Sequence, residues 1–228
     1  MGQGYGAFGK MPALGDFFQL NAPPGFVRTW DDWLQSAMVS AAEAGGASWD
    51  DQYMSAPIWR FALSPGLAGP AKTIGVLMPS VDRVGRRFPL ALMAAVDREG
   101  PIALDHLVED VTFEQLEDLA LASLEDGMDR DRLAGALAGI GEPIPHGYAP
   151  LRRAGNTLVM TQAREDGLAP ELAAGLLGAG GFAHPSLWST LLDGSRRMMI
   201  CDGLPDAHQA RALFDLNAPL WGDARPVP

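Results

Sequence analysis

Apolar residues gather in three stretches in the first half of the chain, and each stretch predicts a β-strand. The stretches cover residues 58–63, 73–78 and 88–96 and are rich in valine, isoleucine, leucine and phenylalanine. Because they follow one another without an intervening helical pattern, we expect them to pair as an antiparallel meander. Residues 5–10 predict a further short strand.

Helical periodicity predicts a long helix after Pro23 and Pro24, since proline is tolerated in the first helical turn. Apolar residues recur on one face from Phe26 to Ala41, and the pair Gly45-Gly46 ends the helix. Three shorter helices are predicted over residues 49–53, 130–137 and 207–214.

Thr112-Phe113-Glu114-Gln115 has the spacing of a capping box, in which the threonine caps a helix and the glutamine reaches back to the cap. The predicted helix buries its leucines and exposes an acidic face made of Glu117, Asp118, Glu125 and Asp126. This face lies within residues 97–132, which carry a net charge of −9. We interpret it as a solvated helix face.

The second half contains an irregular segment and a second group of strands. Residues 141–156 are rich in proline and glycine and mark the place where a lobe boundary would fall. A strand is predicted over 157–162, and a hairpin joins 187–192 to 197–201 through Asp193-Gly194. Residues 1–228 together predict a single α/β domain, with a mixed, largely antiparallel sheet flanked by helices.

The composition supports a folded protein with a sizeable core. Of 228 residues, 47% are hydrophobic and 20% are charged, which is typical of globular chains. The net charge of −11 makes a nucleic-acid partner unfavourable, because phosphates would be repelled. No apolar run reaches the length of a membrane helix and no signal peptide is recognised, so we expect no membrane insertion and a cytoplasmic location.

The sequence offers little catalytic chemistry. The four histidines are scattered and there is one cysteine, so we expect neither a metal site nor a cofactor. The glycine-rich segment Gly4–Gly9 has no preceding strand and lacks the setting of a nucleotide-binding loop. No Gly-x-Ser-x-Gly motif occurs, and Cys201 lies in an apolar strand, where a structural role is expected.

Residues 79–89 form a polar connection between two predicted strands, bracketed by Pro79 and Pro89. Asp82 lies here with three arginines: Arg83, Arg86 and Arg87. These side chains can form an internal ion-pair network with Asp16 or with Asp31 and Asp32, or they can bind a carboxylate or phosphate group. Both interpretations stay open. Because opposite charges are available, we expect this loop to pack near residues 10–16.

Two other groups of residues have structural interpretations. Asp16 follows a turn, where it can either tie the backbone or bind a partner's arginine. Five large aromatic side chains, four of which lie at core periodicity or in strands, are expected to belong to the core rather than to a docking surface. They are Trp30, Trp33, Trp49, Trp59 and Trp188.

Short motifs follow one another along most of the chain. They are Tyr5-Gly6-Ala7-Phe8-Gly9-Lys10-Met11-Pro12, Gly15-Asp16-Phe17, Trp30-Asp31-Asp32-Trp33-Leu34, Ala56-Pro57-Ile58-Trp59-Arg60-Phe61, the run from Gly75 to Arg86, Phe88-Pro89-Leu90, Pro185-Ser186-Leu187-Trp188 and Gly203-Leu204-Pro205. In this order they resemble the TagF family of type VI secretion accessory proteins. The match is loose over residues 127–156.

The resemblance implies a cytoplasmic regulator that represses type VI secretion after translation. It implies a protein partner in the machine, in connection with its forkhead-associated scaffold and a threonine kinase and phosphatase circuit. It brings no catalytic residues and no cofactor, so it implies binding rather than catalysis. The candidate partner-binding residues are Asp16, Ser80, Asp82, Arg83, Arg86 and Arg87. Two alternatives remain, an enzyme acting on a phosphorylated or nucleotide ligand at this Asp/Arg cluster and a purely structural assembly factor.

Overall fold

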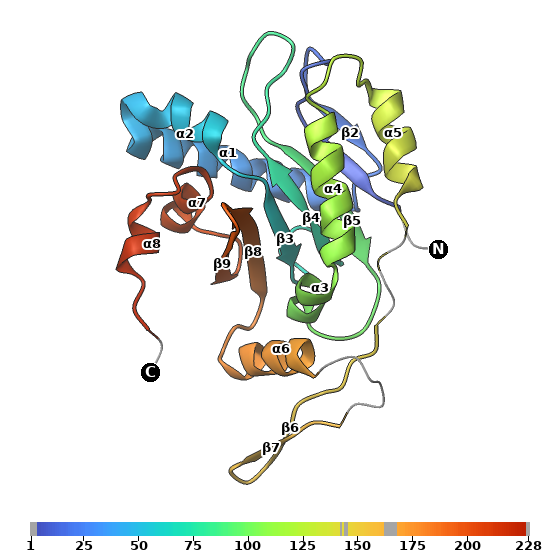
Figure 1. Ribbon diagram of the computed structural model, residues 1–228, viewed down its shortest axis with the longest axis vertical. Helices are drawn as coiled ribbons and strands as arrows, with labels where there is room; N and C mark the ends of the chain where they lie inside the picture. The colour runs from blue at the N-terminus through green and yellow to red at the C-terminus, as the bar shows by residue number, and fades with distance from the viewer. Residues whose placement is uncertain (1–3, 142, 144–145, 162–167, 227–228) are drawn as a thin grey trace.

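A computed structural model describes residues 4–141, 143, 146–161 and 168–226, and a seven-stranded antiparallel sheet runs through it (Figure 1). The strand order is β2-β1-β5-β4-β3-β8-β9. The strands are β1 (Gly6–Gly9), β2 (Phe18–Leu20), β3 (Trp59–Leu63), β4 (Lys72–Met78), β5 (Leu90–Val96), β8 (Pro185–Leu192) and β9 (Ser195–Asp202). The predicted meander is confirmed as β3, β4 and β5, and the mixed α/β class is confirmed with it.

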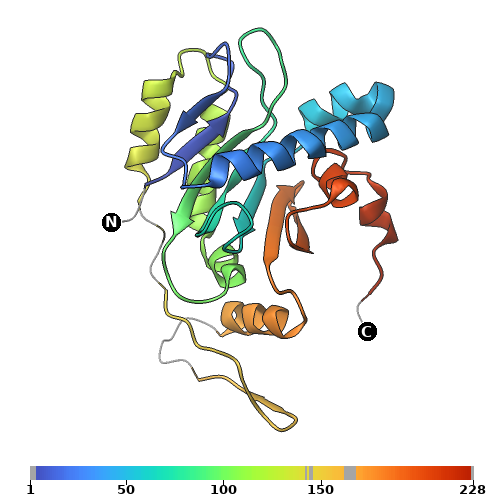
Figure 2. The same ribbon diagram turned by 180° about the vertical axis from the view of Figure 1, so that it is seen from behind.

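Helices cover both faces of the sheet (Figures 1 and 2). One face packs against α1 (Phe26–Gly45), α2 (Trp49–Ser55), α7 (Ala207–Phe214) and α8 (Pro219–Asp223), with a 3-10 turn over Gly46–Ser48. The other face packs against α3 (Ile102–Val108), α4 (Asp110–Ala122), α5 (Arg130–Gly139) and α6 (Ala169–Ala179). The two buried layers follow from strand alternation, which sends successive side chains to opposite faces.

The aromatic residues concentrate on the α1 face. Trp30 from α1 lies 4.7 Å from Phe61 and 6.0 Å from Trp188, measured between ring centroids. Phe61 and Trp188 are cross-strand partners of β3 and β8, so the register brings both rings under the helix. The expectation of buried tryptophans holds fully for Trp30, Trp59 and Trp188, whereas Trp33 and Trp49 are partly buried at the edge of this layer.

A separate hairpin, β6 (Arg152–Ala154) and β7 (Thr157–Val159), extends away from the body of the molecule (Figure 1). The strand predicted over 157–162 therefore ends at Val159, and Gln162 lies outside the described residues. Beyond the irregular segment 141–156, β8 and β9 rejoin the main sheet beside β3. The Asp193-Gly194 hairpin is confirmed.

The predicted capping box at Thr112 is wrong. Helix α4 begins at Asp110, and the Thr112 hydroxyl donates to Glu109 Oε2 at 2.7 Å instead of capping a backbone N–H group. A capping box does occur at the start of α7, where Asp206 accepts from the Gln209 N–H and the Gln209 side chain accepts from the Asp206 N–H. The spacing motif is common to both sites, but α4 directly follows α3, so its first turn has other partners.

Trp59→Ala should lower the free energy of unfolding by about 3–5 kcal/mol, the usual loss for a fully buried large aromatic. Its indole N–H donates to the Leu213 carbonyl oxygen at 2.7 Å, and its ring stacks on Trp221 at 6.0 Å. Trp33→Ala should be less damaging, because Trp33 is partly exposed. Urea unfolding of both variants is the measurement, and equal losses would contradict the packing described.

Candidate functional site

Loop 79–89 packs against the turn that follows β1, as the sequence analysis predicted. The Arg83 backbone N–H donates to the Leu14 carbonyl oxygen at 2.8 Å. The Arg86 guanidinium donates from Nη2 to the Gly15 carbonyl oxygen at 2.6 Å. Two segments about seventy positions apart in sequence are therefore joined by backbone acceptors as well as by charge.

Asp82 is the centre of this loop. Its Oδ1 accepts from the backbone N–H groups of Val84, at 3.1 Å, and Arg86, at 2.9 Å. Its Oδ2 accepts from Arg86 Nε at 2.7 Å and lies 3.1 Å from Lys10 Nζ. The carboxylate side chain is completely buried, so these donors replace the water that it has lost. Of the two interpretations, an internal ion-pair network or a site for a carboxylate or phosphate group, Asp82 follows the first.

The pKa of Asp82 reflects this environment. Burial by itself raises the pKa of the carboxyl group, but hydrogen bonds from the Arg86 backbone, the Lys10 and Arg86 side chains and the Val84 backbone outweigh it. The net result is a pKa well below the ordinary value for aspartate. Asp82 is thus held as an anion whose acceptor positions are occupied, which is an anchoring arrangement.

Helix α2 supports the loop from the other side. The Tyr53 hydroxyl donates to the Ser80 carbonyl oxygen at 2.7 Å and accepts from the Ser80 N–H at 3.0 Å. Burial raises the pKa of Tyr53, so the hydroxyl stays protonated and can serve as the donor. Arg87 Nη2 lies 2.9 Å from Asp50 Oδ2 at the start of α2. Ser80 and Arg87 are therefore attached to α2 rather than to Asp82.

Asp16 does not join the arginines. Its Oδ1 accepts from the N–H of the next residue, Phe17, at 2.8 Å, and no ion pair forms on it within the described part of the chain. Arg83 lies instead beside Gly15, where an added Cβ would come within 3.0 Å of Arg83 Nη2. The predicted pairing of Asp16 with arginine is wrong, because Arg86 binds the carbonyl oxygen of the neighbouring Gly15 and Arg87 binds Asp50 instead.

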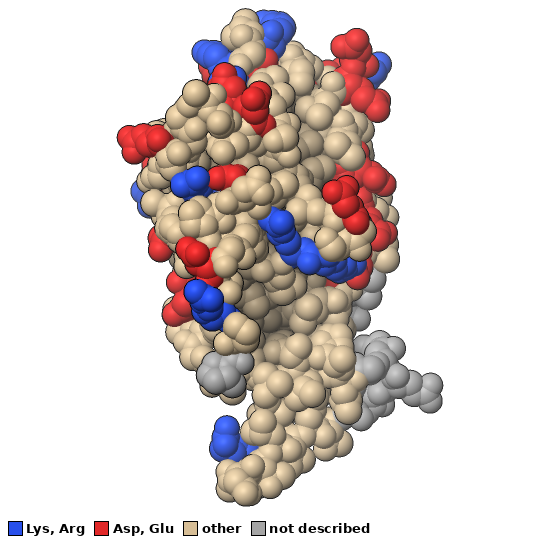
Figure 3. Space-filling view, turned by 60° about the vertical axis from the view of Figure 1, so that its left-hand side comes forward, with Lys and Arg blue, Asp and Glu red and all other residues tan. Residues whose placement is uncertain are grey.

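The loop ends in an exposed tip, which we define as Arg83, Val84 and Gly85. Val84 is 71% exposed, and Gly85 adopts a positive φ of 82° that closes the turn on Asp82. In Figure 3 basic side chains stand out at the top of the molecule, where this loop lies, next to acidic ones. The tip therefore presents an apolar side chain beside a guanidinium group on a braced backbone.

An exposed aromatic residue, Phe17, lies close to the loop base. Phe17 is 46% exposed, yet its ring lies 4.7 Å from Phe88 in an edge-to-face arrangement and 4.8 Å from Lys10 Nζ. Sequence reasoning missed Phe17, Lys10 and Tyr53 as parts of this site. The available signal for Lys10 and Phe17 was their position in motifs next to Asp16, whereas Tyr53 lies in none of the quoted motifs.

Another cluster of charges is buried on the α3 side. Asp105 Oδ2 lies 2.7 Å from Lys72 Nζ, and its Oδ1 lies 2.6 Å from Arg98 Nε and 3.2 Å from His146 Nε2. Glu109 also binds Arg98. This cluster was missed because no recognised spacing motif connects its members.

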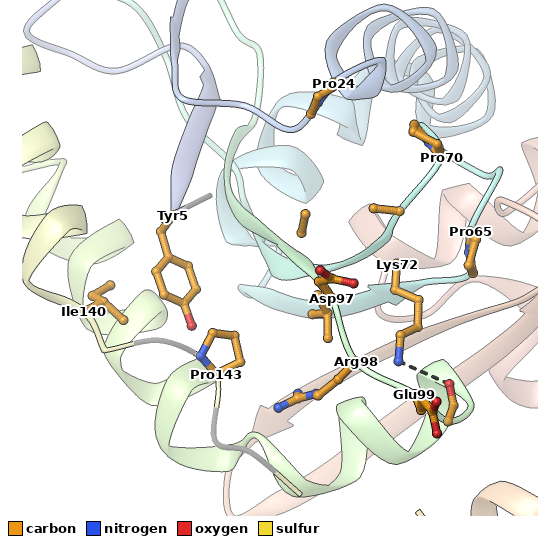
Figure 4. Close-up of a pocket in the computed structure, with 15 residues that line it drawn as sticks. Tyr5, Pro24, Pro65, Pro70, Lys72, Asp97, Arg98, Glu99, Ile140 and Pro143 are labelled. Carbon is orange, nitrogen blue, oxygen red and sulfur yellow. Dashed lines mark hydrogen bonds between the residues drawn. The ribbon is translucent and has the colours of Figure 1, made fainter. Parts of the chain in front are cut away.

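A cavity of about 890 Å³ adjoins this cluster, and Figure 4 shows Lys72 and Arg98 reaching toward it from one side and Tyr5 from another. Proline and alanine side chains make up much of the remaining wall. Since buried carboxylates already pair with Lys72 and Arg98, these cations are neutralised within the protein. Asp97 and Glu99 also line the cavity, so with Lys72 and Arg98 neutralised its wall is more acidic than the balance of its residue types suggests.

The acidic helix face is only partly solvated. Arg60 on β3 binds Glu117 through two hydrogen bonds of 2.7 Å and donates to Asp110 at 2.8 Å. Next to them, His106 Nε2 lies 2.9 Å from Ser189 Oγ. The interpretation of a solvated face therefore fails for Glu117, which joins the helix to the sheet.

The cysteine thiol and the metal-binding side chain types show no arrangement suited to catalysis or metal binding in the described residues. Burial raises the pKa of the Cys201 thiol to about 12, so it stays protonated. Across the described residues, no three side chains of the metal-binding types gather closely enough to hold an ion. In the same part of the chain, every helix is too short or too polar to span a bilayer.

Comparison with known proteins identifies the family of the chain. The model of the TagF N-terminal domain, type VI secretion system-associated, matches residues 6–140. The chain belongs to this family. The crystal structure of PA0076 from Pseudomonas aeruginosa PAO1 is similar, with a TM-score of 0.75 and 31% sequence identity over 98% of this chain and 97% of that one. Comparison with curated proteins gave no match.

The TagF match contains both halves of the site described above, because the turn after β1 and loop 79–89 lie within residues 6–140. Strands β8 and β9 and the helices that follow them lie beyond the family model but within the similarity to PA0076. The protein is thus type VI secretion-associated, and the resemblance inferred from its motifs is confirmed.

Asp82→Asn should lower the urea midpoint of unfolding, because a neutral amide cannot compensate Lys10 and Arg86 in a buried setting. The folded-state pKa of Asp82 is depressed, so its contribution is present above the ordinary pKa and is lost as pH falls below it. The variant should therefore lose less stability than wild type on acidification below about pH 4. Exposed Asp16→Asn is the control, and an equal response of both variants would contradict an anchoring role.

His106 should make stability depend on pH in a higher window. Burial, followed by the charge of Arg60, lowers the pKa of His106 from 6.5 to about 4. The unfolded chain then binds a proton that the folded protein rejects, so stability is complete above pH 6.5 and falls as pH drops toward 4. The total loss should be about 3 kcal/mol. Urea titrations of wild type and His106→Gln at several pH values test this, and parallel pH profiles would refute it.

Proposed function

We propose that this protein represses type VI secretion by binding another protein component of the machine, without catalysis and in the cytoplasm. The observation that carries the proposal is the tip of loop 79–89. Arg83 and Val84 are exposed there, while the residues beneath them are fixed by Asp82. A rigid tip with a guanidinium group and an apolar side chain is suited to recognition, since little entropy is lost on binding.

Three features support binding over catalysis at this site. The acceptor positions of Asp82 are occupied by donors from its own chain, which leaves it poorly suited to act as a general base. Arg86 and Arg87 are likewise engaged, with Gly15 and with Asp50. Arg83 is also exposed and, unlike Arg86 and Arg87, has no carboxylate partner among the described residues.

The partner we propose is the forkhead-associated scaffold, which the TagF resemblance suggests. The tip adds a chemical requirement, because a guanidinium group beside an isopropyl group favours a surface with an acidic side chain next to an apolar recess. Direct titration of the purified scaffold with this protein distinguishes it from other components. A protein that represses secretion yet fails to bind the scaffold would overturn the choice of partner and leave the repressor role standing.

Arg83→Ala and Val84→Asp should each weaken partner binding at least about tenfold and relieve repression of secretion in cells, with melting temperatures close to wild type. Both side chains lie outside the Asp82 network, so the fold should tolerate the changes. Arg132→Ala is the matched control, since Arg132 is an exposed arginine on α5. Variants that fold normally and repress fully would remove the tip from the functional site.

A further inference from the structure

The seven-stranded sheet has two edges that differ in length and cover. At one edge β2 has three residues, and Arg130 Nη2 donates to the Gln19 carbonyl oxygen at 3.1 Å. At the other edge β9 has eight residues. The outer backbone groups of β9 have no hydrogen-bond partner among the described residues. A long, unpaired edge strand is a template for pairing with another strand.

The β8–β9 turn fixes which groups of β9 point outward. Asp193 and Gly194 have positive φ angles of 46° and 80°, the pattern of a two-residue type I′ hairpin turn. The flanking pair, Leu192 and Ser195, therefore exchanges hydrogen bonds, and every second residue of β9 from Ser195 faces β8. The N–H and C=O groups that point outward belong to Arg196, Met198, Ile200 and Asp202.

We propose that β9 pairs antiparallel with β9 of a second copy, around a twofold axis at Met199. In this register Arg196 lies opposite Asp202 of the second copy, and Met198 lies opposite Ile200. All four residues with outward-pointing groups then meet one another, so the ladder hydrogen bonds can form in full. The interface is self-complementary, as a twofold interface must be, and one sheet continues through both copies.

The charges on β9 favour a second copy of the chain as the partner that pairs with this edge strand. Arg196 and Asp202 have opposite signs and lie at equal distances along the strand from Met199, on one face of the sheet. A shift by two residues in either direction would separate them, so the charges favour one register.

The side chains are available for this contact. Arg196 Nη1 lies 3.2 Å from Asp110 across an exposed ion pair, and Asp202 Oδ1 accepts from the His184 N–H. The remaining guanidinium donors and Asp202 Oδ2 have no other partner in the described structure. Between the charged pair, Met198 is 44% exposed and would be covered by Ile200 of the second copy.

Sedimentation equilibrium of the full chain tests the proposal. Wild type should form a concentration-dependent dimer, and Arg196→Asp or Asp202→Arg should each raise the dissociation constant at least about tenfold, because like charges would meet. The double variant Arg196→Asp/Asp202→Arg restores opposite charges and should regain most of the affinity. A wild type that stays monomeric, or a dimer indifferent to all three variants, would overturn the proposal.

A backbone variant provides a second measurement that does not depend on charge. Met198→Pro removes an N–H group that points away from β8, so the β8–β9 ladder stays intact while the dimer ladder loses a donor. Met198→Thr is the matched control, because it shortens the side chain and keeps the N–H group. The proline variant should dissociate the dimer and the threonine variant should largely retain it. Equal dimerisation of both would show that β9 is not the interface, and a strand added only by a different protein would exclude the second copy.

Discussion

A buried carboxylate with donors from two segments, the end of β1 and loop 79–89, is the constraint on which the architecture of the candidate site depends. Asp82 cannot stay charged inside the protein unless Lys10, Arg86 and two backbone N–H groups surround it. Meeting that requirement fixes the end of β1 and the path of the β4–β5 loop relative to each other. The exposed tip has a defined position because the residues beneath it have no freedom to move independently.

The same principle operates on the opposite face of the sheet. Asp105 and Glu109 belong to the acidic stretch of the sequence, yet both are buried and paired with Lys72 and Arg98. Glu117 is likewise bound to Arg60. Lys72 on β4 and Arg60 on β3 thus offset part of the acidic charge of residues 97–132, so the regional net charge of −9 somewhat overstates what a partner would meet at the surface.

Local sequence patterns predicted the strands and turns. The ion-pair partners could not be predicted, because they depend on how distant segments pack. Short apolar stretches located β3 and β4, and Asp193-Gly194 located the β8–β9 turn, because each signal lies within a few residues. The partners of arginine are different, since Arg60 meets Glu117 only after the sheet and α4 have packed. Helix α6 was missed because it exposes leucines and buries Glu171, which reverses the usual amphipathic pattern.

The electrostatic interaction of this acidic protein with a partner differs between long range and close range, because its loop tip is basic. Beyond a Debye length, about 8 Å at physiological salt, the exposed charges are largely screened and the net charge of −11 guides encounter only weakly. Within that distance Arg83, which has no carboxylate partner among the described residues, favours an approach that places an acidic group at the tip. Recognition by loop 79–89 would therefore gain its selectivity from orientation at close range, which requires the rigidity that Asp82 provides.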